Sequence, residues 1–194
     1  MKKELKEQIL ELYQQLKKED STKENRLDRW RNLEPESAEL IAIIIRSQQS
    51  KKVLELGTSN GFSTLWFADA LQSIGGQLTT IEIEATRTEK AKQHLKQFNL
   101  LAPVELITMD ALLYLEQANT EFDLIFLDAE RSYYISYWPH LDRLLQKPGS
   151  LLIVDNVISH QEQVKDFIAL IRRNPNYTLT IDPIGAGLLM VTKV

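Results

Sequence analysis

The sequence predicts a single α/β domain with a mostly parallel sheet flanked by helices and an antiparallel strand at its C-terminal end. Short runs rich in Leu, Ile and Val alternate with amphipathic helical stretches, and polar residues gather at the ends of the runs. Strands of this kind are covered on both faces, as in a parallel sheet. The last two runs flank Asp182 to Gly187, a segment too short for a helix, so the final strand should run antiparallel. The length of 194 residues suits one domain with a sizeable core.

The N-terminal segment predicts an amphipathic helix from Lys2 to about Glu19. Its apolar residues fall on one stripe at helical spacing: Leu5, Ile9, Leu12 and Leu16. Such a stripe is typical of a helix packed on its own domain, and this interpretation is favoured over a lid or a dimer contact. Polar residues from Asp20 to Asn25 predict a connector. We therefore expect a helical extension over residues 1–30 and the main domain over residues 31–194.

The next helix begins at Glu34-Pro35-Glu36 and runs to about Gln48, because proline suits the first helical position and acidic side chains suit the positive end of the helix dipole. Beyond it, strands and helices alternate. The predicted strands are Lys52–Leu56, Gln77–Ile83, Val104–Thr108, Asp123–Asp128, Ser150–Asp155, Tyr177–Ile181 and Leu188–Thr192. The predicted helices are Phe62–Ser73, Thr86–Asn99, Ala111–Gln117, Tyr133–Leu145 and Gln161–Arg172.

Acidic residues occur at the carboxyl ends of five successive predicted strands, which is the edge where open α/β sheets bind ligands. They are Glu55, Glu82, Asp110, Asp128 and Asp155, the last followed by Asn156. Any one of them could instead cap the following helix. Acidic residues at the ends of five successive strands are hard to explain by capping alone, so the sequence predicts a binding site at this edge.

Two glycines, Gly57 and Gly61, follow the first strand and allow a tight turn with a close backbone approach to a ligand. Their spacing matches neither a dinucleotide site nor a P-loop, and no lysine follows to hold a phosphate. Glu82 can accept hydrogen bonds from both hydroxyls of a ribose. The combination indicates an adenosine ligand without a diphosphate, which leaves a nicotinamide-dependent dehydrogenase as a remote alternative.

Five segments occur in the order and at the intervals of a known family: E-L-G-T-S-N-G-F-S, I-E-I-E, M-D-A, F-L-D-A-E-R-S-Y-Y and V-D-N-V. From Asn32 to Thr192 the chain resembles the cation-dependent O-methyltransferases, the group that contains catechol O-methyltransferase and caffeoyl-CoA O-methyltransferase. The resemblance implies a Rossmann-like class I methyltransferase fold, S-adenosylmethionine as the cofactor, and a homodimer.

The resemblance also implies a role for each matching residue. Around the methionine part of the cofactor it places Gly57, Ser59, Gly61 and Ser63, with Glu55 facing the amino group directly or through water. Around the adenosine part it places Glu82 at the ribose and Asp110 with Ala111 at the adenine. It implies a divalent cation bound by Asp128, Asp155 and Asn156, with Asp128 also bordering the cofactor and serving catalysis.

The proposed cation ligands are also consistent with metal chemistry. Two carboxylates and one amide oxygen suit Mg²⁺ best, with Mn²⁺ or Ca²⁺ possible, and suit zinc poorly. Alternatively, Asp155 caps a turn and Asn156 occupies a left-handed position. The cation is favoured because Asp128 takes the matching place on the neighbouring strand. Such an ion would bind two oxygens of a vicinal diol, typically a catechol, and lower the pKa of the hydroxyl to be methylated.

Two residues depart from the family pattern. Arg131 stands where the family has a lysine assigned as general base, and a guanidinium stays protonated. We expect Arg131 to stabilise the oxyanion or to bind an anionic group on the acceptor. Ala186 replaces the aspartate usual in caffeoyl-CoA enzymes. His160 is a candidate replacement base, although a surface or helix-capping role is favoured. Four aromatic residues fit an acceptor-site wall and a core helix face equally well: Tyr133, Tyr134, Tyr137 and Trp138.

The net charge of -4 gives no general attraction for nucleic acid, and the chain contains no cysteine. No secretory signal is visible, and the longest aliphatic run, Leu40 to Ile45, is too short to cross a bilayer. We therefore predict a cytoplasmic enzyme that methylates a small catechol-like acceptor. One alternative acceptor is hydroxyuridine in tRNA, with Arg131 and basic N-terminal residues on phosphates. Another alternative is a cofactor-binding protein that has lost turnover.

Overall fold

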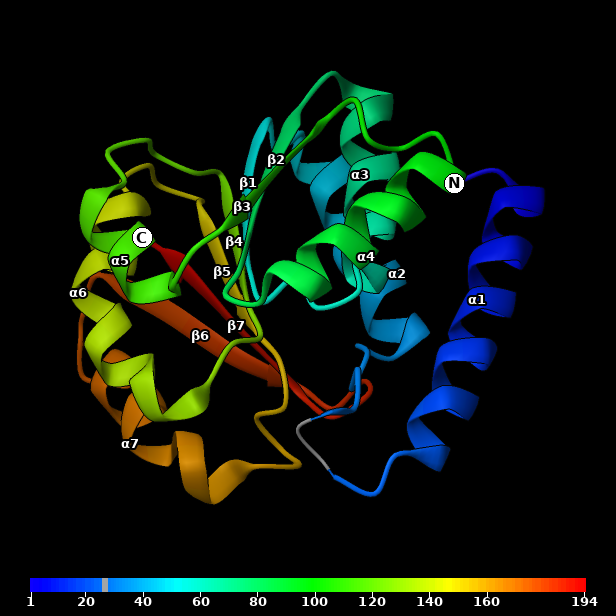
Figure 1. Cartoon of the computed structure of the whole chain (residues 1–194). Helices are drawn as coiled ribbons and strands as arrows, with labels where there is room; N and C mark the ends of the chain where they lie inside the picture. Colours follow the sequence, from blue (N-terminus) through cyan, green and yellow to red (C-terminus); the bar gives the residue numbers. More distant parts are fainter. Residues whose placement is uncertain (26–27) are drawn as a thin grey trace.

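A computed structural model of the chain describes residues 1–25 and 28–194, so Arg26 and Leu27 of the predicted extension lie outside the described residues. Seven strands form one sheet in the order β3-β2-β1-β4-β5-β7-β6 (Figure 1). The strands are β1 (Lys52–Leu56), β2 (Gln77–Glu82), β3 (Val104–Thr108), β4 (Leu124–Leu127), β5 (Leu151–Val154), β6 (Tyr177–Asp182) and β7 (Leu188–Lys193). The helices are α1 (Lys3–Thr22), α2 (Pro35–Gln48), α3 (Phe62–Ile74), α4 (Ala85–Gln97), α5 (Ala111–Gln117), α6 (Tyr134–Leu144) and α7 (Gln161–Arg172), with a short 3-10 turn η2 (Arg131–Tyr133) before α6.

The strand directions confirm the predicted fold class. Strands β1 to β5 run parallel, whereas β7 runs antiparallel to both of its neighbours, β5 and β6. The reversal follows from the short connection between β6 and β7, which leaves room for a turn but not for a crossover helix. Within the described part of the chain, none of the helices combines the length and the apolar character that crossing a bilayer requires.

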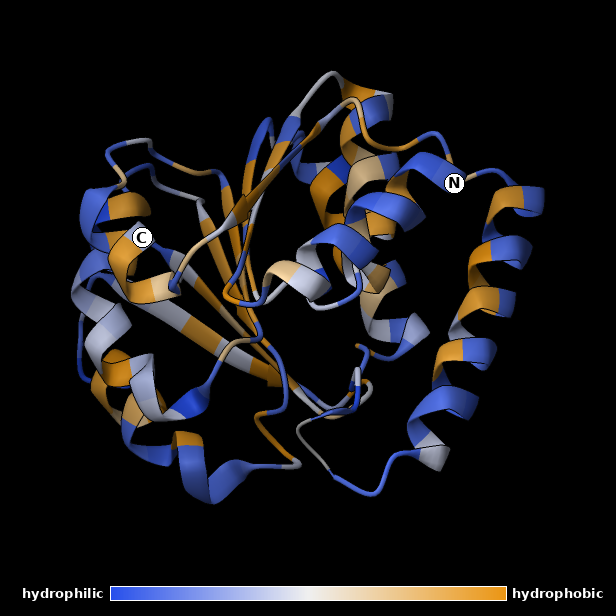
Figure 2. Ribbon diagram, viewed as in Figure 1, coloured by the Kyte–Doolittle hydropathy of each residue, from blue (hydrophilic) through white to orange (hydrophobic). Residues whose placement is uncertain are grey.

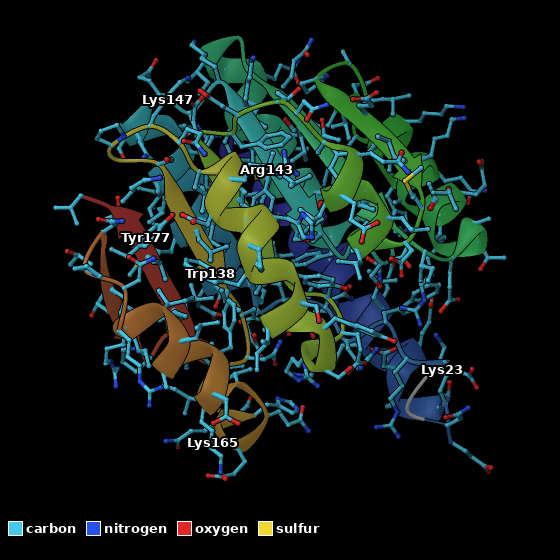
Figure 3. All side chains as sticks on the ribbon, turned by 90° about the vertical axis from the view of Figure 1, so that its left-hand side faces the viewer. Lys23, Trp138, Arg143, Lys147, Lys165 and Tyr177 are labelled. Atoms are coloured by element: carbon cyan, nitrogen blue, oxygen red, sulfur yellow. The ribbon has the colours of Figure 1, made fainter. Side chains whose placement is uncertain are left out.

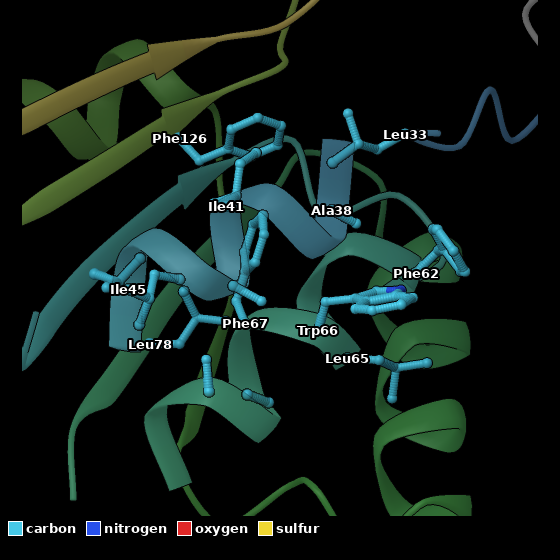
Figure 4. Packing of buried hydrophobic residues seen from close by; sticks show 14 of the residues in the cluster. Leu33, Ala38, Ile41, Ile45, Phe62, Leu65, Trp66, Phe67, Leu78 and Phe126 are labelled. Atoms are coloured by element: carbon cyan, nitrogen blue, oxygen red, sulfur yellow. The ribbon is translucent and has the colours of Figure 1, made fainter. Parts of the chain in front are cut away.

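Helices cover both faces of the sheet. Figure 1 shows α1 to α4 on one side and α5 to α7 on the other, and Figure 2 shows that hydrophobic residues dominate the strands between them. Each side has its own cluster of buried apolar side chains. In the cluster below α2 and α3, Ile41 and Ile45 pack with Phe67 (Figure 4). The parallel strands are therefore enclosed, and their carboxyl ends are left for binding.

Helix α1 belongs to the core on the α2–α3 side. Ile9, Leu12 and Leu16 are 0%, 7% and 1% exposed and lie in the same cluster as the core of the main domain. The predicted connector starts too early, because Asp20 to Thr22 continue the helix. The hydroxyls of Ser21 and Thr22 donate to backbone carbonyls one turn back, which lets these residues finish a helix.

The strands that carry the site end slightly earlier than their sequence patterns predict. Asp128 and Asp155 follow β4 and β5 instead of closing them, although their amides still donate to Leu56 and Leu127 of the neighbouring strands. Ile83 likewise lies outside β2. Both aspartates thus begin the loops at the carboxyl edge, where the chain turns away from the ladder.

Candidate active site

The strand order brings the first strand end and its glycine turn to the middle of the sheet. Strand β1 lies between β2 and β4, so the connections that follow β1 and β4 leave the sheet toward opposite faces. A crevice at such a reversal point is the usual binding place in open α/β sheets. The predicted site residues on β1, β2, β4 and β5 therefore come to one edge.

Gly57 and Gly61 shape the turn between β1 and α3. Gly57 has φ of 104°, and a Cβ there would lie 2.2 Å from the carbonyl oxygen of Asp128. Gly61 has φ of 85°, and a Cβ there would lie 2.9 Å from Cβ of Ala91. Both positions therefore need glycine for conformation and for space. The turn lies against the end of β4 on one side and against α4 on the other.

Glu82 lies beside this turn, as the ribose prediction requires. Its side chain is 9% exposed. Its two carboxylate oxygens accept hydrogen bonds from the amides of Ser59, at 2.8 Å, and Glu84, at 3.0 Å. Each carboxylate oxygen has a further lone pair, so hydroxyls of a ligand can still bind. The end of β2 and the glycine turn are therefore joined by a hydrogen bond from Ser59 to Glu82.

Glu55 is fully buried beneath the turn. Ser63 donates to one of its oxygens, and Thr64 and Thr80 donate to the other at 2.6 and 2.7 Å. Burial raises the pKa of Glu55 to about 7, although these three hydroxyls favour the charged form. Ser63 thus supports Glu55, and the predicted contact of both with the methionine part of a cofactor stays a prediction.

Asp110 caps helix α5. One of its carboxylate oxygens accepts from the amides of Leu112, at 2.9 Å, and Leu113, at 3.1 Å. Capping was the alternative raised for every acidic residue on this edge, and for Asp110 it is present. Ala111 is the first residue of α5, so a role for the pair beside an adenine ring stays a prediction.

Asp128, Asp155 and Asn156 converge. The side-chain amide nitrogen of Asn156 donates to Asp128 Oδ1 at 3.1 Å and to Asp155 Oδ2 at 2.7 Å. Asp155 is 2% exposed, and its other oxygen, Oδ1, is buried without a hydrogen-bond partner. Asn156 has φ of 66°, the left-handed conformation that the alternative explanation expected. The three side chains therefore lie together, with the amide nitrogen of Asn156 facing both carboxylates.

Ionising both Asp128 and Asp155 is electrostatically unfavourable, because the two carboxylates lie close together. Burial raises the pKa of Asp128 to about 6, against the opposing charges of Arg131 and Arg31. Burial and then the charge of Asp128 raise the pKa of Asp155 to about 8. Two adjacent carboxylates, of which Asp155 is buried with an unsatisfied oxygen and Asp128 is partly buried, fit a divalent cation, because the cation favours both charged forms. Within residues 1–25 and 28–194, no group of three or more His, Cys, Asp or Glu side chains offers another metal site.

Arg131 and His160 border these ligands. The Nε of Arg131 donates to Oε1 of Gln163 on α7 at 2.7 Å, which fixes the guanidinium between η2 and α7. His160 precedes the first residue of α7, and its Nδ1 lies 2.9 Å from the hydroxyl of Ser159. That hydroxyl lies 3.3 Å from Oδ1 of Asn156. His160 therefore approaches the edge of the site through Ser159, from the start of a helix.

The four aromatic side chains divide between core and surface. Tyr134, Tyr137 and Trp138 are 1%, 3% and 7% exposed and belong to the core on the α6 side. Trp138 packs edge-on against Tyr177 of β6, with ring centroids 5.1 Å apart (Figure 3). Tyr133 is 50% exposed and stacks on Tyr137. Of these four side chains, Tyr133 alone therefore leaves a large part of its ring open to contact.

One part of the site was not predicted from the sequence. Residues 29–34, here called the crossing segment, run from the glycine turn toward the loop after β5. The hydroxyl of Ser59 donates to the carbonyl of Trp30 at 3.1 Å. The carboxylate of Asp20 accepts from the amides of Trp30, at 2.7 Å, and Arg31, at 2.9 Å. No periodic pattern signals these contacts, because they join single residues from a helix end, a turn and an irregular segment.

Comparison with known proteins agrees with this geometry. Residues 4–184 match the family described as O-methyltransferase. A catechol O-methyltransferase of Niastella koreensis is 34% identical over 131 residues, 66% of this chain and 58% of the relative. A catechol O-methyltransferase of Mycobacterium tuberculosis is 32% identical over 124 residues, which are 63% of this chain and 56% of the relative. The matches thus span less than two thirds of these curated relatives.

Solved structures support the same grouping. The O-methyltransferase from Bacillus cereus in complex with SAH superposes with a TM-score of 0.80 at 25% identity, over 100% of this chain and 92% of that one. The family match covers nearly the whole chain, including α1, α2 and all of the strands up to β6. The chain therefore belongs to the O-methyltransferase family.

Proposed function

We propose that this protein transfers the methyl group of S-adenosylmethionine to a hydroxyl of a small catechol-like acceptor, with a divalent cation bound by Asp128, Asp155 and Asn156. The observation that carries the cation is the buried, unpartnered Oδ1 of Asp155 beside the partly buried carboxylate of Asp128. Family membership and the SAH complex of the Bacillus cereus relative support the methyl donor. The catechol O-methyltransferase relatives support the acceptor class.

The chain's own residues divide the task. The turn from Gly57 to Gly61 would hold the methionine part of the cofactor, and Glu82 would hold the ribose. A bound divalent cation supplies the Lewis-acid chemistry that lowers the pKa of a coordinated hydroxyl. Arg131, fixed by Gln163, would stabilise the negative charge on the acceptor oxygen. The remaining contribution of the protein is alignment of that oxygen with the methyl group.

The test is transfer of labelled methyl from S-adenosylmethionine to a simple catechol with Mg²⁺ or Mn²⁺, with and without a chelator. Asp155→Asn should lower kcat/KM by about 100-fold or more, since it removes a metal ligand. Asp166→Asn, on an exposed position of α7, is the matched control and should retain activity. Chelator-insensitive turnover would refute the cation, and no transfer to any vicinal diphenol would refute the acceptor.

The same assay separates the remaining alternatives. Cofactor binding without methyl transfer to any fraction of a cell extract would favour a protein that has lost turnover. Methylation of bulk tRNA, with binding that weakens as salt rises, would favour the tRNA acceptor. Cytoplasmic location and a homodimer stay predictions.

A further inference from the structure

The crossing segment links the two halves of the proposed site. At one end, Trp30 accepts from Ser59 in the glycine turn. At the other end, Glu34 lies against the β6–β7 turn, where a Cβ on Gly185 would come within 3.1 Å of its Oε2. Backbone carbonyls of the β6–β7 turn accept hydrogen bonds from the amides of Val157 and Ile158, which directly follow Asn156. Arg31 lies between these two anchors, so its backbone crosses between the cofactor turn and the metal loop.

The protein holds Arg31 in an unfavourable backbone conformation. Its φ is 53°, in the left-handed region that is unfavourable for a residue with a side chain. The Asp20 carboxylate stabilises this geometry by accepting from two successive amides. Trp30 is fixed further by its indole N–H, which donates to Glu19 at 2.9 Å, and by Lys23, whose ammonium lies 4.0 Å from the ring centroid. Strain that is held in this way often marks a functional position.

Two arginines act on the metal ligands from different elements. Arg131 lowers the pKa of both Asp128 and Asp155, and Arg31, which is exposed to solvent, also lowers the pKa of Asp128. Arg131 is thus the closer candidate for the reacting oxygen. Arg31 adds a second, solvent-exposed guanidinium on the Asp128 side of the site, and its planar fork suits a carboxylate or a phosphate. The negative charge of Glu34 has the opposite effect, because it raises the pKa of both Asp128 and Asp155.

We propose that Arg31 is a specificity-determining residue that binds an anionic substituent, a carboxylate or a phosphate, on the hydroxylated acceptor. The proposal rests on the proposed function, since it assigns the acceptor of that same site. In this assignment Arg131 and the cation stabilise the reacting oxygen, and Arg31 binds a different group of the acceptor. It also explains why Asp20 positions the backbone at Arg31 with two hydrogen bonds.

The experiment compares four catechols that differ only in the group at the end of a two-carbon side chain: a carboxylate, a phosphate ester, an alcohol and an amine. The wild-type protein should show the lowest KM for one of the two anionic compounds, and the better of them identifies the anion. Arg31→Gln should raise KM for both anionic catechols by roughly tenfold, because it removes a charge-assisted contact. KM for the alcohol should stay within about twofold, since no charged contact is lost.

Two variants separate recognition from a structural role. Arg173→Gln removes another exposed arginine, at the C-terminal end of α7, and should change none of the values. Asp20→Asn weakens the hold on the backbone of Arg31 but leaves the Arg31 guanidinium in place, so it should raise KM for the two anionic compounds by less than Arg31→Gln does and leave KM for the alcohol nearly unchanged. If Arg31→Gln affects the alcohol as strongly as the carboxylate, or if the wild type prefers the amine, the proposal is wrong.

Binding gives a readout that does not depend on turnover. Calorimetric titration of the carboxylate catechol, in the presence of SAH and Mg²⁺, should show roughly tenfold weaker binding to Arg31→Gln. If no catechol is methylated but this difference is found, the proposed reaction fails and the anion site stands. If the carboxylate catechol does not bind while tRNA binds and loses affinity in Arg31→Gln, the proposal is overturned in favour of an RNA phosphate.

Discussion

Gly57 joins the two halves of the site because its α-carbon lies against the backbone of Asp128. A side chain there would meet the carbonyl oxygen that precedes the metal loop, and the backbone is already in a region that favours glycine. Replacement therefore moves the cofactor turn and the first metal ligand at the same time. Gly57 therefore couples the position of the cofactor turn to the position of Asp128 through steric contact alone.

Gly57→Ala should lower the free energy of unfolding by about 3 kcal/mol or more, the sum of left-handed strain and overpacking. Gly149→Ala is the matched control, because Gly149 has φ of 83° with nothing within 4 Å of the added Cβ. It should cost only the strain, about 1 kcal/mol. Denaturant titration measures both values. Equal losses in the two variants would show that the approach to Asp128 is not limiting.

Asn156 shows how one residue can satisfy two explanations. Its left-handed φ of 66° is the conformation expected of a turn residue, and its amide also links both aspartates. Asparagine tolerates this conformation better than most residues and still carries a hard oxygen for a metal. The turn explanation and the metal explanation are therefore compatible at this position.

At the scale of elements, the sequence predicts the strands and the order of their acidic ends well. Leu, Ile and Val runs identify buried strands, and a parallel order forces Glu82, Asp128 and Asp155 to the same edge. The crossing segment could not be predicted in this way. Asp20 contacts Trp30 and Arg31 through hydrogen bonds that depend on where α1 ends in space. The role of Asp110 could not be predicted from the sequence either, since an aspartate suits both a helix cap and a ligand contact.

Helix α1 offers a test of whether the extension is a separate unit. Leu16 is 1% exposed and packs in the main core, whereas Leu10 on the same helix is only partly buried. Leu16→Ala should lower the free energy of unfolding by about 2–4 kcal/mol, and Leu10→Ala by clearly less. A single cooperative transition is expected in both. If Leu16→Ala leaves the main transition unchanged, residues 1–30 unfold independently of residues 31–194.

At the scale of the whole molecule, the site places ionisable groups where they have little contact with water: Glu55 and Asp155 are buried and Asp128 is partly buried. Glu55, Asp128 and Asp155 all have raised pKa values, with burial as the largest cause in each case. Burial lowers the pKa of His94, which lies on the other side of the turn and bonds to the carbonyl of Asn60. The cluster favours binding of cationic ligands at the expense of stability in their absence.

This arrangement predicts a pH dependence for the metal-free protein. The pKa of Glu55 rises from 4.5 to about 7 on folding, so between these values the folded state retains a proton that the unfolded state has lost. Stability should therefore fall as pH rises from about 4.5 to about 7, by roughly 3 kcal/mol from this group. Below that window the contribution is fully present, and above it the loss is complete.

Glu55→Gln isolates this contribution, because it keeps the shape and removes the titration. Denaturant unfolding with a chelator present, at pH 5 and at pH 8, should show a smaller loss of stability in the variant than in the wild type. Asp128 and Asp155 contribute with the same sign and are unchanged by the substitution, so some pH dependence should remain. His94 opposes them below its ordinary pKa, since its charged form is disfavoured in the fold. Parallel curves for the two proteins would show that the buried Glu55 is ionised throughout, held by Ser63, Thr64 and Thr80.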